Sequence, residues 1–225
     1  MGITGPLIGS GRTADVFALD DAWVLRRYRG WGDAAREAVV MAYLHEKGYP
    51  VPQVREEGAT RSDLVMQRLS GPTMAEAGMR GSITPEDAGL LLARLLRDLH
   101  AIPARASAVA AGHRVLHLDL HPENVILAPS GPMVIDWSNT EEGPPGLDWA
   151  MSALILAEVA VGARVESGVG RAALAGLLSD IPAGLRLTAD GHLAAARARR
   201  ATNPTLSAAE VRRLDEAVDA VVELS

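Results

Sequence analysis

The sequence contains no cysteine and only one lysine, Lys47, among its 225 residues. Without cysteine, disulfide bonds, thiolate metal sites and cysteine nucleophiles are excluded. A mechanism that needs a second lysine is excluded too, because the other basic residues are all arginines, 21 of a total of 22. Aromatic residues are scarce at 4%, against 48% for apolar residues as a whole. We therefore expect a core built mainly from Leu, Val, Ile and Ala.

Long apolar runs and an excess of positive charge are missing as well. The most hydrophobic stretch, residues 149–157, has nine residues, whereas a membrane span needs about 20. Residues 1–12 lack the basic region and the apolar run of a secretory signal. The 28 acidic against 22 basic residues give a net charge of −6, which argues against a nucleic-acid partner. A cytoplasmic protein with neither a membrane nor a nucleic-acid partner is expected.

The first part of the chain shows the patterns of strands and of one helix. Residues 16–19 and 23–28 are rich in β-branched and aromatic residues, and Asp20-Asp21 between them predicts a hairpin turn. Apolar residues spaced by three and four predict a helix over 33–47, with Gly48 at its C-terminal end. A further strand is expected at 64–69.

The rest of the chain is predicted to be mainly helical. Thr84-Pro85-Glu86-Asp87 is a strong helix start, because threonine caps the helix and proline suits its first position. Two short strands, 125–127 and 133–135, are expected on either side of a turn-rich linker. Besides the helix at about 84–100, we expect helices at about 146–163, 169–179, 189–201 and 207–223.

This order of elements predicts an α+β fold. Residues 1–69 would form a small strand-rich N-terminal lobe, and residues 70–225 a larger helical C-terminal lobe. A cleft is expected between the two lobes.

The segment HLDLHPEN, residues 117–124, is the most informative part of the sequence. Asp119 precedes Asn124 by five positions. Asp136 follows directly after the second of the two expected strands, 133–135. Such oxygen-bearing side chains can converge on one hard cation such as Mg²⁺, with substrate phosphates as further ligands, and leave a carboxylate to take a hydroxyl proton. The alternative is a polar loop capped by Asp and Asn.

This segment resembles the kinase catalytic loop, His-x-Asp-x-x-x-x-Asn, and its ending, His-Pro-x-Asn-Val-Ile-Leu, resembles the aminoglycoside phosphotransferase (APH) family of small-molecule kinases. The resemblance implies a bilobal protein-kinase-like fold with ATP and Mg²⁺ as cofactors. It further implies that Asp119 is the catalytic base, that Asn124 is a metal ligand, and that Asp136 bridges the metal to the ATP phosphates.

The N-terminal part resembles the nucleotide-binding half of a kinase. Residues 9–17 look like a glycine-rich loop with Ala14 in place of the third glycine, so that Gly9 and Gly11 would let backbone N–H groups approach the phosphates and Val16 would cover the purine. Val24-Leu25-Arg26 takes the place of the segment that carries the phosphate-binding lysine, with Arg26 as the phosphate contact. Because successive side chains of a strand point to opposite faces, the side chains of Arg26 and Arg27 are expected on different faces of the sheet.

Glu37, on the first turn of the helix at 33–47, would be the ion-pair partner of Arg26. A surface strand arginine and an acid that favours the helix dipole are the alternatives for this pair. In the strand at 64–69, the resemblance places Met66 at the back of the nucleotide pocket, while the backbone groups of Gln67 and Leu69 would bind the adenine edge. An ordinary apolar strand edge is equally compatible with this segment. Asp148 resembles the buried acid that braces the catalytic loop through its backbone or His117.

The acceptor is expected to be a small molecule. Only twelve positions lead from Asp136 to Asp148, and they hold no Ala-Pro-Glu segment, which leaves little room for a loop that docks a peptide. We therefore expect transfer of the γ-phosphoryl group of ATP to a hydroxyl of an aminoglycoside-like compound, an amino alcohol or a sugar, by a monomer or homodimer. Glu141, Glu142 and Glu123 could give the acceptor side a negative rim.

Three departures from the family pattern keep an alternative open. Ala14 replaces a glycine, Ser138 stands where many relatives have a second acid, and Arg26 replaces lysine. Arginine differs from lysine in size and in bidentate geometry. The alternative is a catalytically weak or inactive nucleotide-binding protein of the same fold, with a regulatory or partner-binding role.

Overall fold

The structure is a computed structural model that describes residues 5–11, 13–30, 33–55, 60–105, 112–162, 164–204 and 206–225. These residues belong to two compact units. The first comprises Met1–Pro72 and Val125–Thr140, and the second comprises Thr73–Asn124 and Glu141–Ser225. The division into lobes at residues 69 and 70 stays a prediction; the hairpin at 125–140 belongs to the first unit.

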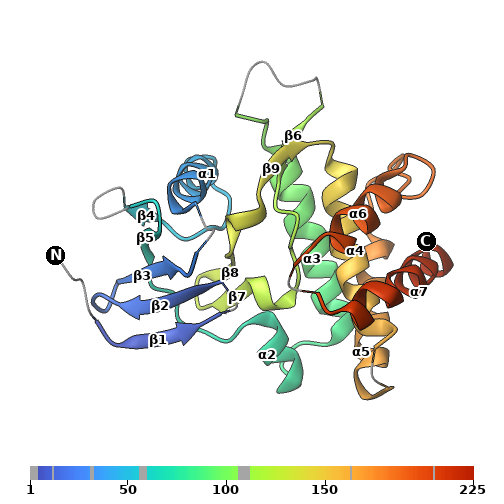
Figure 1. Ribbon diagram of the computed structural model, residues 1–225, viewed down its shortest axis with the longest axis horizontal. Coiled ribbons are helices and arrows are strands. Elements are labelled where there is room, and N and C mark those ends of the chain that lie inside the picture. Colours follow the sequence, from blue (N-terminus) through green and yellow to red (C-terminus); the bar gives the residue numbers. More distant parts are fainter. Residues whose placement is uncertain are drawn as a thin grey trace. The chain divides into compact units, whose positions relative to one another are not determined.

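The first unit is built on a five-stranded antiparallel sheet (Figure 1). In chain order its strands are β1 (Leu7–Ser10), β2 (Ala14–Ala18), β3 (Trp23–Tyr28), β4 (Val54–Arg55) and β5 (Asp63–Gln67). Their order across the sheet is β1-β2-β3-β5-β4. Asp20 closes the turn from β2 to β3, because its Oδ1 accepts the backbone N–H groups of Ala22 and Trp23 at 2.7 and 2.8 Å.

Helix α1 (Ala34–Glu46) follows β3. The Asp33 side chain caps it by accepting the N–H of Arg36 at 3.1 Å, and Gly48 ends it with a φ of +79°, which favours glycine. The unit is completed by the hairpin of β7 (Val125–Ala128) and β8 (Gly131–Val134), and by the 3₁₀ turn η2 (Trp137–Asn139). Gly71 lies against β7, where a Cβ would stand 2.3 Å from the carbonyl oxygen of Leu127.

The second unit is mainly helical (Figure 1). It contains α2 (Met74–Met79), α3 (Pro85–Ala101), α4 (Pro145–Ala160), α5 (Arg164–Ser179), α6 (His192–Ala201) and α7 (Ala208–Leu224). Strand β6 (Arg114–Leu116) pairs with β9 (Glu141–Gly143), and the 3₁₀ turn η1 is Pro122–Asn124. Helix α4 packs against α5, α6 and α7 and has buried residues on all sides, Trp149 and Leu154 among them.

Helices α3 and α5 approach each other closely through glycines. A Cβ on Gly89 would lie 2.0 Å from the carbonyl oxygen of Ala173, and one on Gly176 would lie 2.3 Å from that of Glu86. Both distances are far below van der Waals contact with backbone that cannot swing away. These two positions therefore set how near the helices can pack.

The predicted α+β class is confirmed, with an antiparallel sheet in the N-terminal part and helices after it. The predicted start of α3 is confirmed, because the Thr84 side chain accepts the N–H of Asp87 at 3.1 Å and Pro85 is the first helical residue. Among the helices and strands, the sequence patterns did not predict β1, β4, α2, β6 and β9. None of the helices in the described ranges combines the length and the hydrophobicity that a membrane-spanning segment requires.

Candidate active site

The loop that carries Asp119 is anchored by a buried carboxylate on α4. Asp148 has no exposed surface, and its oxygens accept the backbone N–H groups of His117 at 2.8 Å and of Leu118 at 2.7 Å. The ring Nε2 of His100, at the end of α3, lies 3.1 Å from the same carboxylate. The bracing role expected of Asp148 matches these contacts, whereas His100 was not predicted.

The hydrogen bonds around Asp148 control its ionisation. Burial alone would raise its pKa, but the hydrogen bond with His100 and the N–H group of His117 outweigh burial and lower the pKa below its usual value. Asp148 is therefore a buried anion whose charge is compensated by donors on three sides. Leu118, one of these donors, has a backbone φ of +63°, a conformation that non-glycine residues rarely adopt.

Asn124 lies at the end of the same loop, in η1, and its side chain is held by two neighbours. Its Nδ2 donates to the backbone carbonyl of Asp119 at 2.8 Å and lies 3.2 Å from Nε2 of His121. With the amide nitrogen turned to these partners, the amide oxygen is the atom that can serve as a ligand. His121 Nε2 is 4.0 Å from Oδ1 of Asp119, and burial lowers the pKa of His121 although Asp119 opposes this.

A second cluster lies in the first unit, where Arg26 joins two carboxylates. Its Nη1 donates to Oε1 of Glu37 at 2.8 Å, and its Nη2 donates to Oδ1 of Asp136 at 2.7 Å. Oε1 of Glu37 also accepts the backbone N–H of Trp137 at 3.0 Å, so Glu37 ties α1 to the segment that follows β8. The predicted ion pair between Arg26 and Glu37 is present, and the contact with Asp136, 110 residues away, adds to it.

Arg26 and Glu37 are both buried, which strengthens the interaction between them. Arg26 is 7% exposed and Glu37 1%. Burial alone would lower the pKa of Arg26, but the carboxylates of Glu37 and Asp136 raise it above its ordinary value. Arg26 is therefore a permanent buried cation. The alternative of a surface strand arginine is wrong for this residue.

Asp136 itself has a left-handed backbone conformation with a φ of +64°, which Asp tolerates better than most residues. Its Oδ1 also accepts the hydroxyl of Ser138 at 2.8 Å. Ser138, which replaces the second acid of many relatives, thus orients the carboxylate in place of adding a charge.

The glycine-rich loop joins β1 to β2. Its turn is closed by the N–H of Gly11, which donates to the carbonyl of Ala14 at 2.8 Å. Neither Gly9 nor Gly11 has a positive φ, and a Cβ at either would meet its neighbours at ordinary distances of 3.7 and 3.6 Å. The fold therefore does not itself require glycine at these two positions.

Residues around this loop were missed by the sequence patterns. The Ser10 hydroxyl donates to Asp15 at 2.7 Å, and Arg29 reaches the same carboxylate at 3.1 Å from the end of β3. Arg29 also donates to the carbonyl of Gly11. The side chain of Arg29 thus lies across the loop from strand to turn.

The remaining predicted nucleotide contacts lie on or after β5. Met66 is paired with Val24, and Gln67 with Trp23, in the antiparallel register of β3 and β5. The N–H of Gln67 donates to the carbonyl of Gln53 at 2.7 Å, and the half-buried Leu69 follows the strand.

The structure therefore distributes the predicted site residues over the two units. The first unit holds Gly9, Gly11, Val16, Arg26, Glu37, Met66, Gln67, Leu69 and Asp136, and the second holds Asp119 and Asn124.

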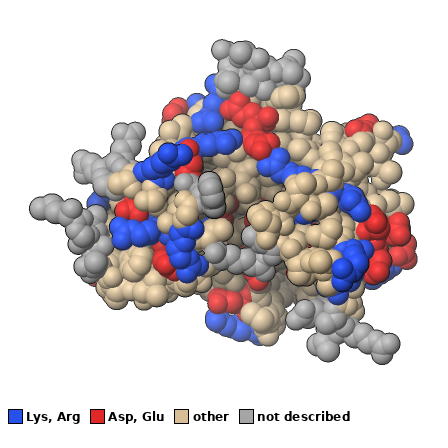
Figure 2. Space-filling view, viewed as in Figure 1, with Lys and Arg blue, Asp and Glu red and all other residues tan. Residues whose placement is uncertain are grey.

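The acids after Asp136 have arginine partners. Glu141 forms a bidentate ion pair with Arg199 at 2.7 and 3.0 Å, and Glu142 accepts from the backbone N–H and Nε of Arg105 at 2.9 and 3.3 Å. Figure 2 shows acidic and basic side chains interspersed over the face that it presents. Because Glu141 and Glu142 are already paired, they do not supply the negative rim that was expected of them.

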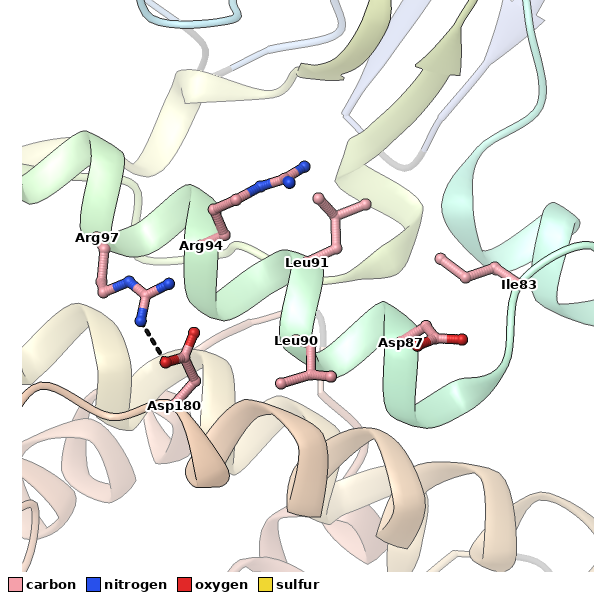
Figure 3. Close-up of a pocket in the computed structure, with 7 residues that line it drawn as sticks. All are labelled: Ile83, Asp87, Leu90, Leu91, Arg94, Arg97 and Asp180. Atoms are coloured by element: carbon pink, nitrogen blue, oxygen red, sulfur yellow. Dashed lines mark hydrogen bonds and ion pairs between the residues drawn. The ribbon is translucent and has the colours of Figure 1, made fainter.

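A shallow cavity of about 380 Å³ lies along α3 in the second unit (Figure 3). It is lined by Ile83, Asp87, Leu90, Leu91, Arg94, Arg97 and Asp180. Arg97 and Asp180 are joined across it by an ion pair. None of the predicted catalytic, nucleotide-binding or metal-binding residues lines this cavity. Within the described ranges, no group of three or more His, Asp or Glu residues could hold a metal ion.

Comparison with known families gives a match over most of the chain. The model of the APH family, described as phosphotransferase enzyme family, matches residues 4–114 and 105–187. Among curated proteins, none matches the sequence significantly.

Several solved structures share the fold. A Plasmodium vivax ethanolamine kinase has a TM-score of 0.60 at 10% identity, covering 96% of this chain and 81% of that one. The complex of gentamicin with APH(2″)-IIa has a TM-score of 0.57 at 14% identity, covering 97% and 89%. An amicoumacin kinase in complex with AMP-PNP, Ca²⁺ and Ami has a TM-score of 0.52 at 12% identity, covering 97% of this chain and 87% of that one. These likenesses confirm the kinase-like fold.

Proposed function

The chain belongs to the APH family of phosphotransferase enzymes, and we propose that it transfers the γ-phosphoryl group of ATP to a hydroxyl group of a small molecule. The observation that carries this proposal is the chain of contacts from the buried Glu37 through the buried Arg26 to the partly exposed Asp136. It gives the nucleotide-binding sheet a permanent cation, fixed by one carboxylate and adjacent to a second. Such an arrangement suits phosphate groups and their counter-ion.

In this proposal Asp119 is the catalytic base. The acceptor oxygen forms a bond to the γ-phosphorus, the bond from that phosphorus to the β-phosphate oxygen breaks, and the hydroxyl proton passes to the Asp119 carboxylate. The anchoring of His117 and Leu118 by Asp148 supports this role, because it fixes the backbone directly before Asp119. A base held in place needs no reorganisation as the proton moves.

The oxygen atoms that Asn124 and Asp136 carry suit a magnesium ion in their chemistry. Asn124 offers its amide oxygen, because its nitrogen is occupied by Asp119 and His121, and Asp136 offers a carboxylate. Two oxygen ligands from the protein with phosphates for the rest is the usual pattern for Mg²⁺. When bound, the ion would neutralise the phosphate charge. We propose that Asn124 and Asp136 hold it.

Gly9, Gly11 and Val16 are proposed to cover the nucleotide, and Met66, Gln67 and Leu69 to line its base. The glycines support this reading, since the local fold makes no demand for glycine at positions 9 and 11. What they provide is backbone N–H groups without a neighbouring Cβ, which is what a phosphate needs in order to approach.

The proposed acceptor is a small hydroxylated compound. The similar proteins named above include an ethanolamine kinase, a protein bound to gentamicin and an amicoumacin kinase. An aminoglycoside-like compound, an amino alcohol and a sugar are therefore all candidates for this chain. The pairing of Glu141 and Glu142 with arginines removes one reason to favour a cationic acceptor.

A substrate screen that measures ADP release tests the proposal. We expect turnover with at least one hydroxyl compound, and a loss of roughly 10²–10⁴-fold in kcat for Asp119→Asn, the usual contribution of a general base. Asp98→Asn, at an exposed position on α3, is the matched control and should leave kcat unchanged. Binding of ATP and Mg²⁺ without turnover on a broad panel would contradict the proposal.

A nucleotide-binding protein without catalysis is a second candidate. It is favoured by one observation, the ion pair that Arg26 makes with the proposed metal ligand Asp136. Calorimetry with ATP and Mg²⁺ separates the two functions: binding with slow turnover that depends on Asp119 supports the kinase, and binding that is indifferent to Asp119→Asn with no turnover supports the second candidate.

A further inference from the structure

Tyr28 lies directly beside the arginine that replaces the usual lysine. The guanidinium carbon of Arg26 is 4.9 Å from the centroid of the Tyr28 ring, within the range of a cation–π interaction. Tyr28 is 6% exposed, and its hydroxyl donates to Oε2 of Glu37. One side chain therefore contacts both members of the Arg26–Glu37 pair.

The Tyr28 ring is placed where it can pack against the guanidinium group of Arg26. Nη1 and Nη2 of Arg26 are directed to Glu37 and Asp136, so the edge of the guanidinium is taken up by carboxylates and its face is left for packing. An aromatic ring binds such a planar face well. A lysine ammonium has no face, and could not use the ring to fix an orientation.

The hydroxyl of Tyr28 restricts Glu37 in turn. With Oε2 occupied by Tyr28, Glu37 presents only Oε1 to Arg26, and the N–H of Trp137 binds that same oxygen. The carboxylate is thereby prevented from rotating. Burial, together with the negative charge of Glu37, raises the pKa of Tyr28, so the hydroxyl stays a donor at any ordinary pH.

We propose that Tyr28 is the positioning residue that adapts this site to arginine: it fixes the plane of Arg26 and the rotation of Glu37, and so sets where Arg26 meets the nucleotide phosphates. The inference rests on the proposed function, in which Arg26 is the phosphate contact. Arg26 stands where lysine is usual, and Tyr28 is the residue that accompanies this change. Tyr28 lies two residues after Arg26 on β3, so both side chains are on the same face of the sheet.

A double-mutant cycle tests this inference. Tyr28→Leu and Tyr28→Phe are made in the natural chain and in the Arg26→Lys variant, and binding of a fluorescent ATP analogue is measured alongside KM for ATP and kcat. With Arg26 present, Tyr28→Leu should weaken nucleotide binding by roughly tenfold, the effect of losing a desolvated cation–π contact. Tyr28→Phe, which keeps the ring, should cost less. In the Arg26→Lys background, the difference between Tyr28→Leu and Tyr28→Phe, which reports on the ring alone, should fall below about twofold.

Tyr43 on α1 gives a matched control, because its ring contacts Lys47 at 5.4 Å in a comparable cation–π pair outside the candidate site. Tyr43→Leu should leave nucleotide binding unchanged, and thermal unfolding of each variant verifies that it is folded. If Tyr28→Leu does not fold, Tyr28→Met takes its place, because it also fills the space of the ring without an aromatic face. Equal effects of the Tyr28 variants in both backgrounds would overturn the inference.

Arg26→Ala distinguishes this outcome from failure of the proposed function. If Arg26→Ala abolishes nucleotide binding while the Tyr28 variants are additive with Arg26→Lys, only the inference about Tyr28 is wrong. If Arg26→Ala leaves nucleotide binding unchanged, the phosphate-binding role of Arg26 is wrong, and the inference falls with it.

Discussion

Leu118 and Asp148 are joined by a 2.7 Å hydrogen bond that holds an uncommon backbone conformation directly before Asp119. Leu118 has a φ of +63° and is 1% exposed. A non-glycine residue in this region persists only where its surroundings hold it there, at a cost of about 1–3 kcal/mol. The buried carboxylate of Asp148 provides that constraint.

Asp148→Asn should destabilise the fold. The asparagine amide would retain one acceptor oxygen. Its NH₂ group would face the N–H of His117 or Leu118, which in the natural chain binds a carboxylate oxygen. Loss of a buried charge-assisted hydrogen bond, with a donor left unpaired, leads us to expect a decrease of about 3 kcal/mol in the free energy of unfolding. Urea unfolding at pH 7 measures it, and a decrease below about 1 kcal/mol would contradict the anchoring role.

The same residue gives the stability a pH dependence of known sign. The pKa of Asp148 is lowered in the folded protein, so its contribution is fully present above the unfolded value of about 3.9 and is lost as the pH falls below that value through the folded pKa. The difference in unfolding free energy between the natural chain and Asp148→Asn should therefore shrink as the pH falls below about 4. A difference that grows in acid would show that the pKa is raised instead.

Glycines in the two units should respond differently to alanine. Gly89→Ala places a Cβ against backbone of α5, so we expect a loss of about 3 kcal/mol or more in stability. Gly11→Ala meets only ordinary contacts, and should change stability by less than about 1 kcal/mol. It should nevertheless raise KM for ATP, since the added methyl group obstructs the approach of a phosphate. Urea unfolding and steady-state kinetics on both variants separate the structural glycine from the ligand-facing one.

The sequence predicted those elements that carry strong local signals. The cap and proline at Thr84-Pro85 locate the start of α3, and the aromatic and aliphatic residues at 23–28 locate β3. Strands β6 and β9 have three residues each and pair across more than twenty positions, so nothing local marks them. Helix α2 was missed although Thr73 and Glu76 form a capping box, a pattern that was readable in the sequence.

The candidate site shows the same limit. The Arg26–Glu37 pair followed from the family resemblance, but the contact of Arg26 with Asp136 spans 110 residues and depends on tertiary structure. Tyr28 could have been found, because residues two apart on a strand point to the same face. The partners of Glu141 and Glu142 could not, since both arginines come from distant segments with no shared pattern.

Arg26→Lys tests whether arginine limits the reaction. A lysine would retain the charge but could bind Glu37 and Asp136 only through one ammonium, and it would lose the contact of the guanidinium with the Tyr28 ring. We expect KM for ATP to rise by about threefold to tenfold, with unfolding free energy lowered by about 1 kcal/mol. A large gain in kcat/KM would show instead that arginine impairs catalysis and that the site has not adapted to it.

The neighbouring arginines Arg199 and Arg200 on α6 allow a last comparison within one helix. Arg200 binds Glu158 on α4 bidentately at 2.7 and 2.9 Å with side chains only 11% and 16% exposed, whereas the bidentate pair of Arg199 with Glu141 is 36% and 46% exposed. Breaking a largely buried pair leaves an uncompensated charge, so Arg200→Gln should cost about 2 kcal/mol of unfolding free energy. Arg199→Gln should cost less than about 1 kcal/mol, and less again in 1 M salt, because exposed pairs are screened. Equal costs for the two variants in low salt would show that burial does not determine the strength of these ion pairs.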